Sequence, residues 1–268
     1  MATFPAPAND NTEDIDLALL RAAEENDVER MKRLLKQNAN INVRGSNNDT
    51  PLISASRLGN AEAVALLIEK KADTSMVNDI GQTALNAALR DHAPEKVIRS
   101  LITAGSPLDL KDKWHRAAAY YAAQDNLPGI MRALAENKAD LKIANEDGIT
   151  PLIHATRLPD HRDVIAVLLE FDPGINQPTE KKETALMFAV VSKDAKLVAN
   201  YIAKGANPLQ QDESGMSALD FAKAAGDAAT IAVVQEAIGK LYAPLGTGHE
   251  NEVAAPGRAA FKKKIPAL

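Results

Sequence analysis

The pattern of apolar positions repeats along the chain. A small apolar residue returns at intervals of 33 or 34 residues, at Ala22, Ala55, Ala88, Ala122, Ala155, Ala189 and Ala222. A leucine stands three places before most of these alanines, as at Leu52, Leu85 and Leu152. Residues three apart share one helix face, so each unit is predicted to begin with a short helix whose small alanine allows close helix packing.

A second apolar segment follows the first in each unit. It reads Val-Ala-Leu-Leu-Ile over 64–68 and Val-Ile-Ala-Val-Leu-Leu over 164–169, and an Ala-Asp phrase follows at 72–73 and 139–140. A polar stretch with Gly81 or its counterparts then leads into the next unit. The predicted unit is helix, short turn, helix, long turn. A fixed period of this length indicates a solenoid.

The start of each unit carries a helix-capping signal. The seven units begin near Leu17, Thr50, Thr83, Ala117, Thr150, Thr184 and Ser217. Thr is a good N-cap because its hydroxyl accepts from an unpaired backbone N–H. Proline at the next place, as at Pro51 and Pro151, suits the first helical position, where its missing N–H costs nothing.

Together these phrases resemble the ankyrin repeat family over roughly residues 14–238. The shared features are Thr-Pro-Leu-x-x-Ala, Gly59-Asn60, the Leu-Leu pair, Ala-Asp and the Gly before the next Thr. The resemblance implies an all-α solenoid of about seven stacked helix-turn-helix repeats, caps included. The family's common histidine after the leucine is absent, and His115 stands where Gly is usual. Two units are one residue longer than the others, and the extra residue is expected near Pro94 in one and near Pro159 in the other.

The chain is expected to hold one elongated repeat domain over 14–242. Hydrophobic residues make up 46% of it but aromatic residues only 4%, which suits thin helical layers. Residues 1–13 are rich in Pro, Ala, Asn and Asp, and we expect them to be disordered. Residues 243–268 form a Pro/Gly-rich tail with a basic C-terminal run. This tail is either a solvated segment or a short docking or address signal.

Charge and composition exclude several function classes. The net charge of −5 argues against nucleic-acid binding by the whole chain, although a local basic patch stays open. Absence of cysteine excludes disulfides and cysteine chemistry. The N-terminus lacks a secretory signal pattern and no run reaches the length of a membrane span. We expect a cytoplasmic protein, with delivery into another cell by a specialised secretion system also open.

Candidate chemistry is sparse. The histidines are spread over different units and the tail, without the spacing of a metal site. His154, at a mainly apolar helix position, is expected to be partly buried and hydrogen-bonded. No Gly-rich phosphate loop or Gly-x-Ser-x-Gly elbow is present. We therefore expect no cofactor, no metal, no small-molecule substrate and no catalysis.

In a stack, equivalent positions of successive units form rows across the surface. Seven places after each unit start stand Glu24, Arg57, Arg90, Gln124, Arg157, Val191 and Ala224. Arg57, Arg90 and Arg157, with Gln124 between them, predict a basic ladder along the concave side. Arginine captures carboxylates bidentately, so the ladder is expected to meet an acidic face of a protein partner. The alternative is that these arginines are only solubilising or pair with neighbours such as Asp91.

The tips of the long turns form a second row. Its apolar members Ile80, Trp114, Ile149 and Met216 are candidate anchors for a partner, and Lys113 and Arg116 flank the single tryptophan. Tryptophan and arginine are enriched among the residues that dominate binding energy. Alternatively, Trp114 folds back with Tyr120 and Tyr121 to cover the irregular middle unit.

The resemblance implies a non-catalytic module that binds a protein partner through its concave helix surface and turn tips. One alternative is an inhibitor or immunity-type protein that blocks a target enzyme or toxin. Another is a bacterial effector that acts on a host protein. An enzyme would need a clustered titratable site. The scaffold does not specify the partner, because specificity in a repeat fold depends on surface residues.

Overall fold

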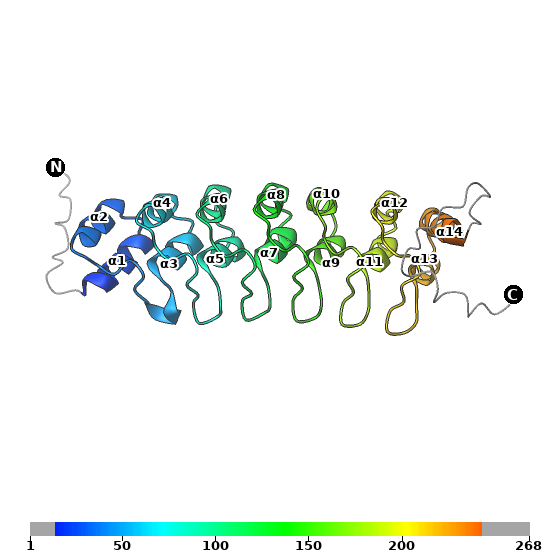
Figure 1. Ribbon diagram of the computed structural model, residues 1–268, viewed down its shortest axis with the longest axis horizontal. Helices are drawn as coiled ribbons and strands as arrows, with labels where there is room; N and C mark the ends of the chain where they lie inside the picture. The colour runs from blue at the N-terminus through cyan, green and yellow to red at the C-terminus, as the bar shows by residue number, and fades with distance from the viewer. Residues whose placement is uncertain (1–13, 243–268) are drawn as a thin grey trace, which may run out of the picture.

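The computed structural model describes residues 14–242, and the expectations for 1–13 and 243–268 lie outside the described residues. The described part is a single row of helix pairs that runs from the first repeat to the last (Figure 1). Its elements are, in chain order, α1 (Ile15–Glu24), α2 (Val28–Lys36), the 3-10 turn η1 (Ser46–Asn48), α3 (Pro51–Arg57), α4 (Ala61–Glu69), α5 (Ala84–Arg90), α6 (Glu95–Thr103), α7 (Ala118–Gln124), α8 (Pro128–Glu136), α9 (Pro151–Thr156), α10 (Arg162–Glu170), α11 (Ala185–Val191), α12 (Ala195–Ala203), α13 (Ala218–Ala225) and α14 (Ala228–Tyr242).

The helices form two layers, as the repeat pattern predicted. Figure 1 shows the odd-numbered helices in one layer and the even-numbered helices in a second layer above it, with the long turns projecting from the opposite side. The seven periodic alanines all lie at the contact between helices with no exposed surface. The predicted all-α solenoid and its register are therefore confirmed.

The sequence signals at the helix starts form the expected caps. The hydroxyls of Thr50, Thr83 and Thr150 each accept from the backbone N–H three residues on, at 3.2–3.3 Å. In the irregular middle unit α7 begins after Ala117, which offers no side-chain cap. The two longer units carry their extra residue between the helices, because α5 and α6 are separated by 91–94 and α9 and α10 by 157–161, whereas only 58–60 separate α3 and α4.

A left-handed backbone residue shapes each long turn. Two places before each of the later unit starts, φ is positive at Asn48, Gly81, His115, Gly148, Lys182 and Gly215. Glycine adopts this conformation at little steric cost, whereas a side chain such as that of His115 is strained there. The usual glycine is thus a requirement of the turn, and the middle unit meets it with a less suitable residue.

A ladder of backbone bonds joins successive turns. The N–H groups of Asp79, Lys113, Glu180 and Glu213 donate to carbonyls of the preceding turn, at Asn47, Ile80, Asp147 and Lys181, over 2.9–3.1 Å. Within residues 14–242 the equivalent bond from Glu146 to the turn of Trp114 does not form. The side chain of Lys111 spans this step instead and donates to the Ala144 carbonyl at 3.2 Å.

The tight helix contact at Ala122 gives a stability prediction. Ala122 has no exposed surface in α7, so Ala122→Leu should overpack the interface and lower the free energy of unfolding by about 2 kcal/mol. Ala65 is exposed on α4, and Ala65→Leu should change stability by less than about 0.5 kcal/mol. Urea unfolding followed by circular dichroism measures both. Equal midpoints for the two variants would contradict the close packing at Ala122.

Candidate protein-binding surface

Two rows of side chains meet on one surface of the stack. The ends of the odd-numbered helices contribute Glu24, Arg57, Arg90, Gln124, Arg157, Val191 and Ala224. The long turns contribute the residues just before each unit start, namely Asp49, Gln82, Arg116, Ile149, Glu183 and Met216. We call this combined surface the inner face. It carries most of the candidate residues predicted from the sequence, so its geometry decides what they can do.

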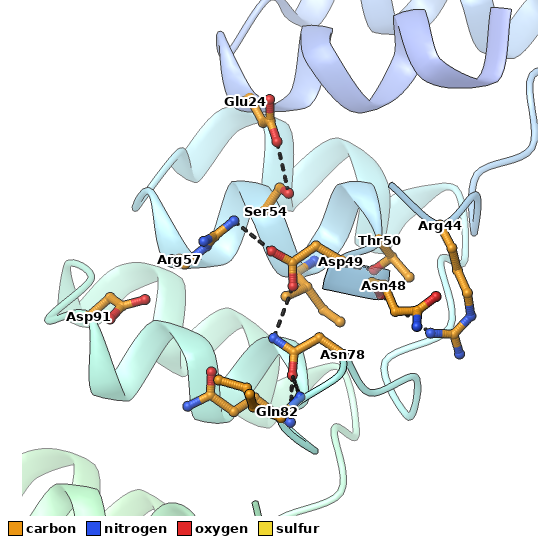
Figure 2. Close-up of polar contacts among 12 residues, drawn as sticks. Glu24, Arg44, Asn48, Asp49, Thr50, Ser54, Arg57, Asn78, Gln82 and Asp91 are labelled. Carbon is orange, nitrogen blue, oxygen red and sulfur yellow. Dashed lines mark hydrogen bonds and ion pairs between the residues drawn. The ribbon is translucent and has the colours of Figure 1, made fainter. Parts of the chain in front are cut away.

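At the second unit, Arg57 belongs to a polar network rather than standing alone. Its Nη2 lies 2.6 Å from Oδ2 of Asp49, whose side chain is almost fully buried. The other oxygen of Asp49 accepts from the amide of Asn78 in the next turn at 2.9 Å. Figure 2 shows Asp49 held between Arg57 and Asn78, with Ser54 donating to Glu24 nearby. A buried carboxylate needs its partners, so Arg57 has a structural task.

Arg90 is also neutralised within the chain. Its guanidinium donates to both carboxylate oxygens of Asp91, at 2.9 and 3.2 Å. These hydrogen bonds raise the pKa of Arg90. The pairing with Asp91 that was the alternative from sequence is therefore observed, and two of the three ladder arginines have a carboxylate partner of their own.

Arg157 has a different environment. Its guanidinium lies over the ring of Phe188 from the next repeat, with Cζ 5.4 Å from the ring centroid. Both residues line a surface recess of about 370 Å³ together with Ile149. The recess is completed by Asp147, Thr179, Glu180, Lys181 and Glu183. Among the described residues, none of these carboxylates forms an ion pair with Arg157.

Trp114 lies half-buried at its turn tip, between two cations. Nζ of Lys113 lies 4.5 Å from the centroid of the Trp114 ring, and Cζ of Arg116 lies 5.8 Å from it. Arg116 also lies over Tyr120, at 5.1 Å. Within the described residues no direct ring contact joins Trp114 to Tyr120 or Tyr121.

Tyr121 and Asp112 fill the interior of that middle unit. Tyr121 has no exposed surface, and its hydroxyl donates to Oδ2 of the buried Asp112. Burial, together with the negative charge of Asp112, raises the pKa of Tyr121. The other oxygen of Asp112 accepts from the backbone N–H groups of Trp114 and Arg116, at 2.9 and 3.0 Å. This carboxylate therefore fixes the turn that presents Trp114.

His154 is partly buried and hydrogen-bonded, as expected from the sequence. Its Nδ1 lies 3.0 Å from the hydroxyl of Tyr120, and the two rings are in contact with centroids 4.6 Å apart and planes tilted by 40°. Burial lowers the pKa of His154 to about 4, and the positive charges of Arg157 and Arg116 act in the same direction. The imidazole is therefore neutral at pH 7, and the positive charge here comes from the arginines.

The remaining candidates are less prominent. Ile80, Met216 and Gln124 are half-buried, each in a different repeat. The side chain of Val191 is exposed at 52% and continues the row beyond Arg157. The sequence rows located these positions and Asp49, but they did not predict Phe188 as a site residue or the buried contacts of Asp49 and Asp112. Phe188 lies on the same helix as Val191, one turn earlier, so an additional row four places after each unit start would have found it.

Two further searches concern other kinds of site. Residues 14–242 contain no group of three or more His, Asp or Glu side chains arranged to hold a metal ion. No helix in that range combines the length and the apolar content that crossing a bilayer requires.

Comparison with known proteins places the chain in a well-populated group. The family model described as ankyrin repeats (3 copies) matches residues 19–112 and 91–179. The human B-cell lymphoma 3 protein is 33% identical over 188 residues, which is 66% of this chain and 41% of that protein. The human mitochondrial disaggregase is 27% identical over 188 residues, 66% of this chain and 25% of that protein. The chain thus spans well under half the length of these curated relatives.

Two solved structures share the fold. The crystal structure of the ankyrin repeat domain of Bcl-3 superposes with a TM-score of 0.73 at 22% identity, covering 83% of this chain and 100% of that one. The human ASB11 ankyrin repeat domain gives a TM-score of 0.64 at 22% identity, covering 82% of this chain and 96% of that one.

Proposed function

This chain belongs to the ankyrin repeat family, and from that premise we propose that it is a non-catalytic module whose inner face binds a protein partner with an acidic surface. Ankyrin repeats generally mediate protein–protein interaction, and solenoids offer extended surfaces for it. The observation that carries the proposal is the group of arginines on this face, of which Arg116 and Arg157 have no carboxylate partner among the described residues. They lie beside the half-buried apolar turn residues Ile149 and Met216.

The energetic roles of these residues follow from their environments. Apolar side chains that are half-buried at a turn tip lose their remaining exposed area when a partner covers them, which favours binding. Arginines at the rim of such a surface steer an acidic partner and fix its register. A one-to-one complex that abolishes the partner's activity would identify the inhibitor type of function within this proposal.

The test is capture of a partner from source-cell lysate by the purified chain, read by mass spectrometry. The variant Arg57→Gln, Arg90→Gln, Arg157→Gln is expected to lose the captured protein by about tenfold or more, because the positive row is removed. Glutamine is preferred to glutamate, since a new carboxylate beside the buried Asp49 would destabilise the fold.

A matched control removes the same charge elsewhere. Arg99, Arg132 and Arg162 lie on the even-numbered helices α6, α8 and α10, each at least two-fifths exposed and outside the inner face. Their triple glutamine variant should capture the partner as the wild type does, and circular dichroism confirms that both variants are folded. Equal capture by all three proteins would exclude the inner face as the binding surface.

A further inference from the structure

The cations of the inner face fall into two classes. Arg57 and Arg90 are each paired with a carboxylate of the chain, Asp49 and Asp91. Lys113, Arg116 and Arg157 contact aromatic rings instead, and no carboxylate of residues 14–242 forms an ion pair with any of the three. The charge that is still available for a partner therefore lies in the turn that leads into the fourth repeat and in the fifth repeat.

These cations and rings form a continuous arrangement, which we call the cation–aromatic strip: Lys113, Trp114, Arg116, Tyr120, His154, Arg157 and Phe188. Arg116 lies over Trp114 and Tyr120, and the Tyr120 ring contacts the ring of His154 in the next repeat. Arg157 lies over Phe188 of the repeat after that. The strip thus connects three repeats without a single acidic side chain in it.

Stacking on a ring prepares a guanidinium for an anion. The ring attracts the positive charge and restricts the guanidinium plane, but it does not use up the N–H donors. Nε of Arg116 is buried and has no hydrogen-bond partner among the described residues, so a carboxylate would reach this guanidinium at its Nη groups. His154 between the two arginines is neutral at pH 7, so the arginines alone supply the positive charge there. The guanidinium groups of Arg116 and Arg157 therefore keep N–H donors that can bind carboxylates.

A recess with a mixed polar and apolar lining lies beside the strip. Ile149 and Phe188 line the space of about 370 Å³ into which Arg157 also faces. Such a space accepts one aliphatic or aromatic side chain, and burial of that side chain would contribute affinity that an ion pair at a wet surface does not.

Resting on the proposed function, we propose that the partner's binding segment is an acidic peptide that docks on the cation–aromatic strip. Its carboxylates pair with Arg116 and Arg157, and an apolar side chain next to them enters the recess over Ile149 and Phe188. Arg57 and Arg90 hold the scaffold and do not contact this segment.

The surroundings favour a peptide over a nucleic acid. Asp147, Glu180 and Glu183 border the recess, so negative charge interrupts the positive surface on the side of the sixth repeat. A polyanion needs a continuous positive track along its phosphates, and the chain as a whole has a net charge of −5. Carboxylates spaced along a peptide can contact the two arginines and avoid these acids.

The experiment selects a random-peptide phage library on the immobilised wild-type chain and measures the enriched peptides by fluorescence anisotropy. Three folded variants are compared: Arg116→Gln with Arg157→Gln, Arg57→Gln with Arg90→Gln, and the outer-helix pair Arg99→Gln with Arg132→Gln. We expect peptides that carry Asp or Glu next to an apolar residue. Their affinity should fall about tenfold or more in the first variant and stay within about twofold in the other two.

The outcomes separate this inference from the proposed function. Acidic peptides that lose affinity only in the Arg57 and Arg90 variant would overturn the strip and leave inner-face binding standing. Peptides without acidic enrichment, or tighter binding of single-stranded oligothymidine than of any peptide, would overturn the acidic-peptide assignment. Failure to select any peptide would overturn the acidic-peptide assignment and leave the proposed function to the lysate capture. Peptides indifferent to every inner-face substitution would overturn both proposals.

Discussion

Replacement of Asp112 by alanine is expected to lower the free energy of unfolding by about 4 kcal/mol. Asp112 is 3% exposed and accepts three hydrogen bonds, from the backbone of Trp114 and of Arg116 and from the Tyr121 hydroxyl. Without the carboxylate, all three donors lose their acceptor, and the Tyr121 hydroxyl is left buried without a partner. A loss of this size needs such a cluster of orphaned groups, because most single substitutions cost far less.

Asp212 is the matched control, since it performs only the turn part of this task. It accepts from the backbone N–H groups of Ser214 and Met216 at 2.9 and 2.8 Å, without a tyrosine partner. Asp212→Ala should therefore cost about 1–2 kcal/mol. Urea unfolding with a Tyr121→Phe double-mutant cycle isolates the hydroxyl bond. Similar losses for the two aspartates would show that the buried tyrosine contact contributes little.

Gly148→Ala is expected to destabilise the stack by about 3 kcal/mol, the second largest effect. Gly148 has φ +74°, and a Cβ there would lie 2.7 Å from the backbone nitrogen of Glu180 and 2.9 Å from the Cα of Thr179. Backbone atoms cannot move aside as a flexible side chain can. The next turn would have to shift, and the bond from Glu180 to the Asp147 carbonyl would be lost.

A control variant at Gly215 distinguishes the effect of the steric clash from the effect of the left-handed backbone conformation. It stands at the same place in the turn before α13 with φ +80°, but a Cβ there meets nothing within 4 Å, and residues 14–242 contain no later long turn that would pack against it. Gly215→Ala should cost only about 1 kcal/mol, the strain of the left-handed conformation. Thermal unfolding of both variants measures the difference. Equal losses would mean that neighbouring turns separate freely.

The fold was predictable because the same capping and packing residues recur at the same positions of most repeats. Thr50, Thr83 and Thr150 begin helices as expected, and every alanine of the periodic row is buried. The middle unit departs from the pattern in sequence, and its structure shows the reason. Ala117 offers no side-chain cap there, and the contact that distinguishes the unit is the bond from the Tyr121 hydroxyl to the buried Asp112.

The surface was predictable only in part. Counting positions correctly located Arg57, Arg90 and Arg157 in one row, but a row does not say which neighbour each charge meets. Asp49 lies eight places before Arg57 and pairs with it, whereas Phe188 lies in the next repeat and stacks on Arg157. The difference between a neutralised and an available arginine arises from contacts across turns and repeats, which the spacing of residues does not encode.

The missing backbone bond between the turns of Trp114 and Glu146 has a mechanical consequence. Other adjacent turns are joined by a main-chain hydrogen bond, so the row of turns resists bending there, whereas at this step the helices and the flexible Lys111 side chain make the connection. We therefore expect the solenoid to bend more easily at this step than at the other steps between turns. Arg116 and Arg157 stand on opposite sides of it. A ligand that binds both arginines would connect the two repeats across this step. Binding would then also reduce bending of the stack.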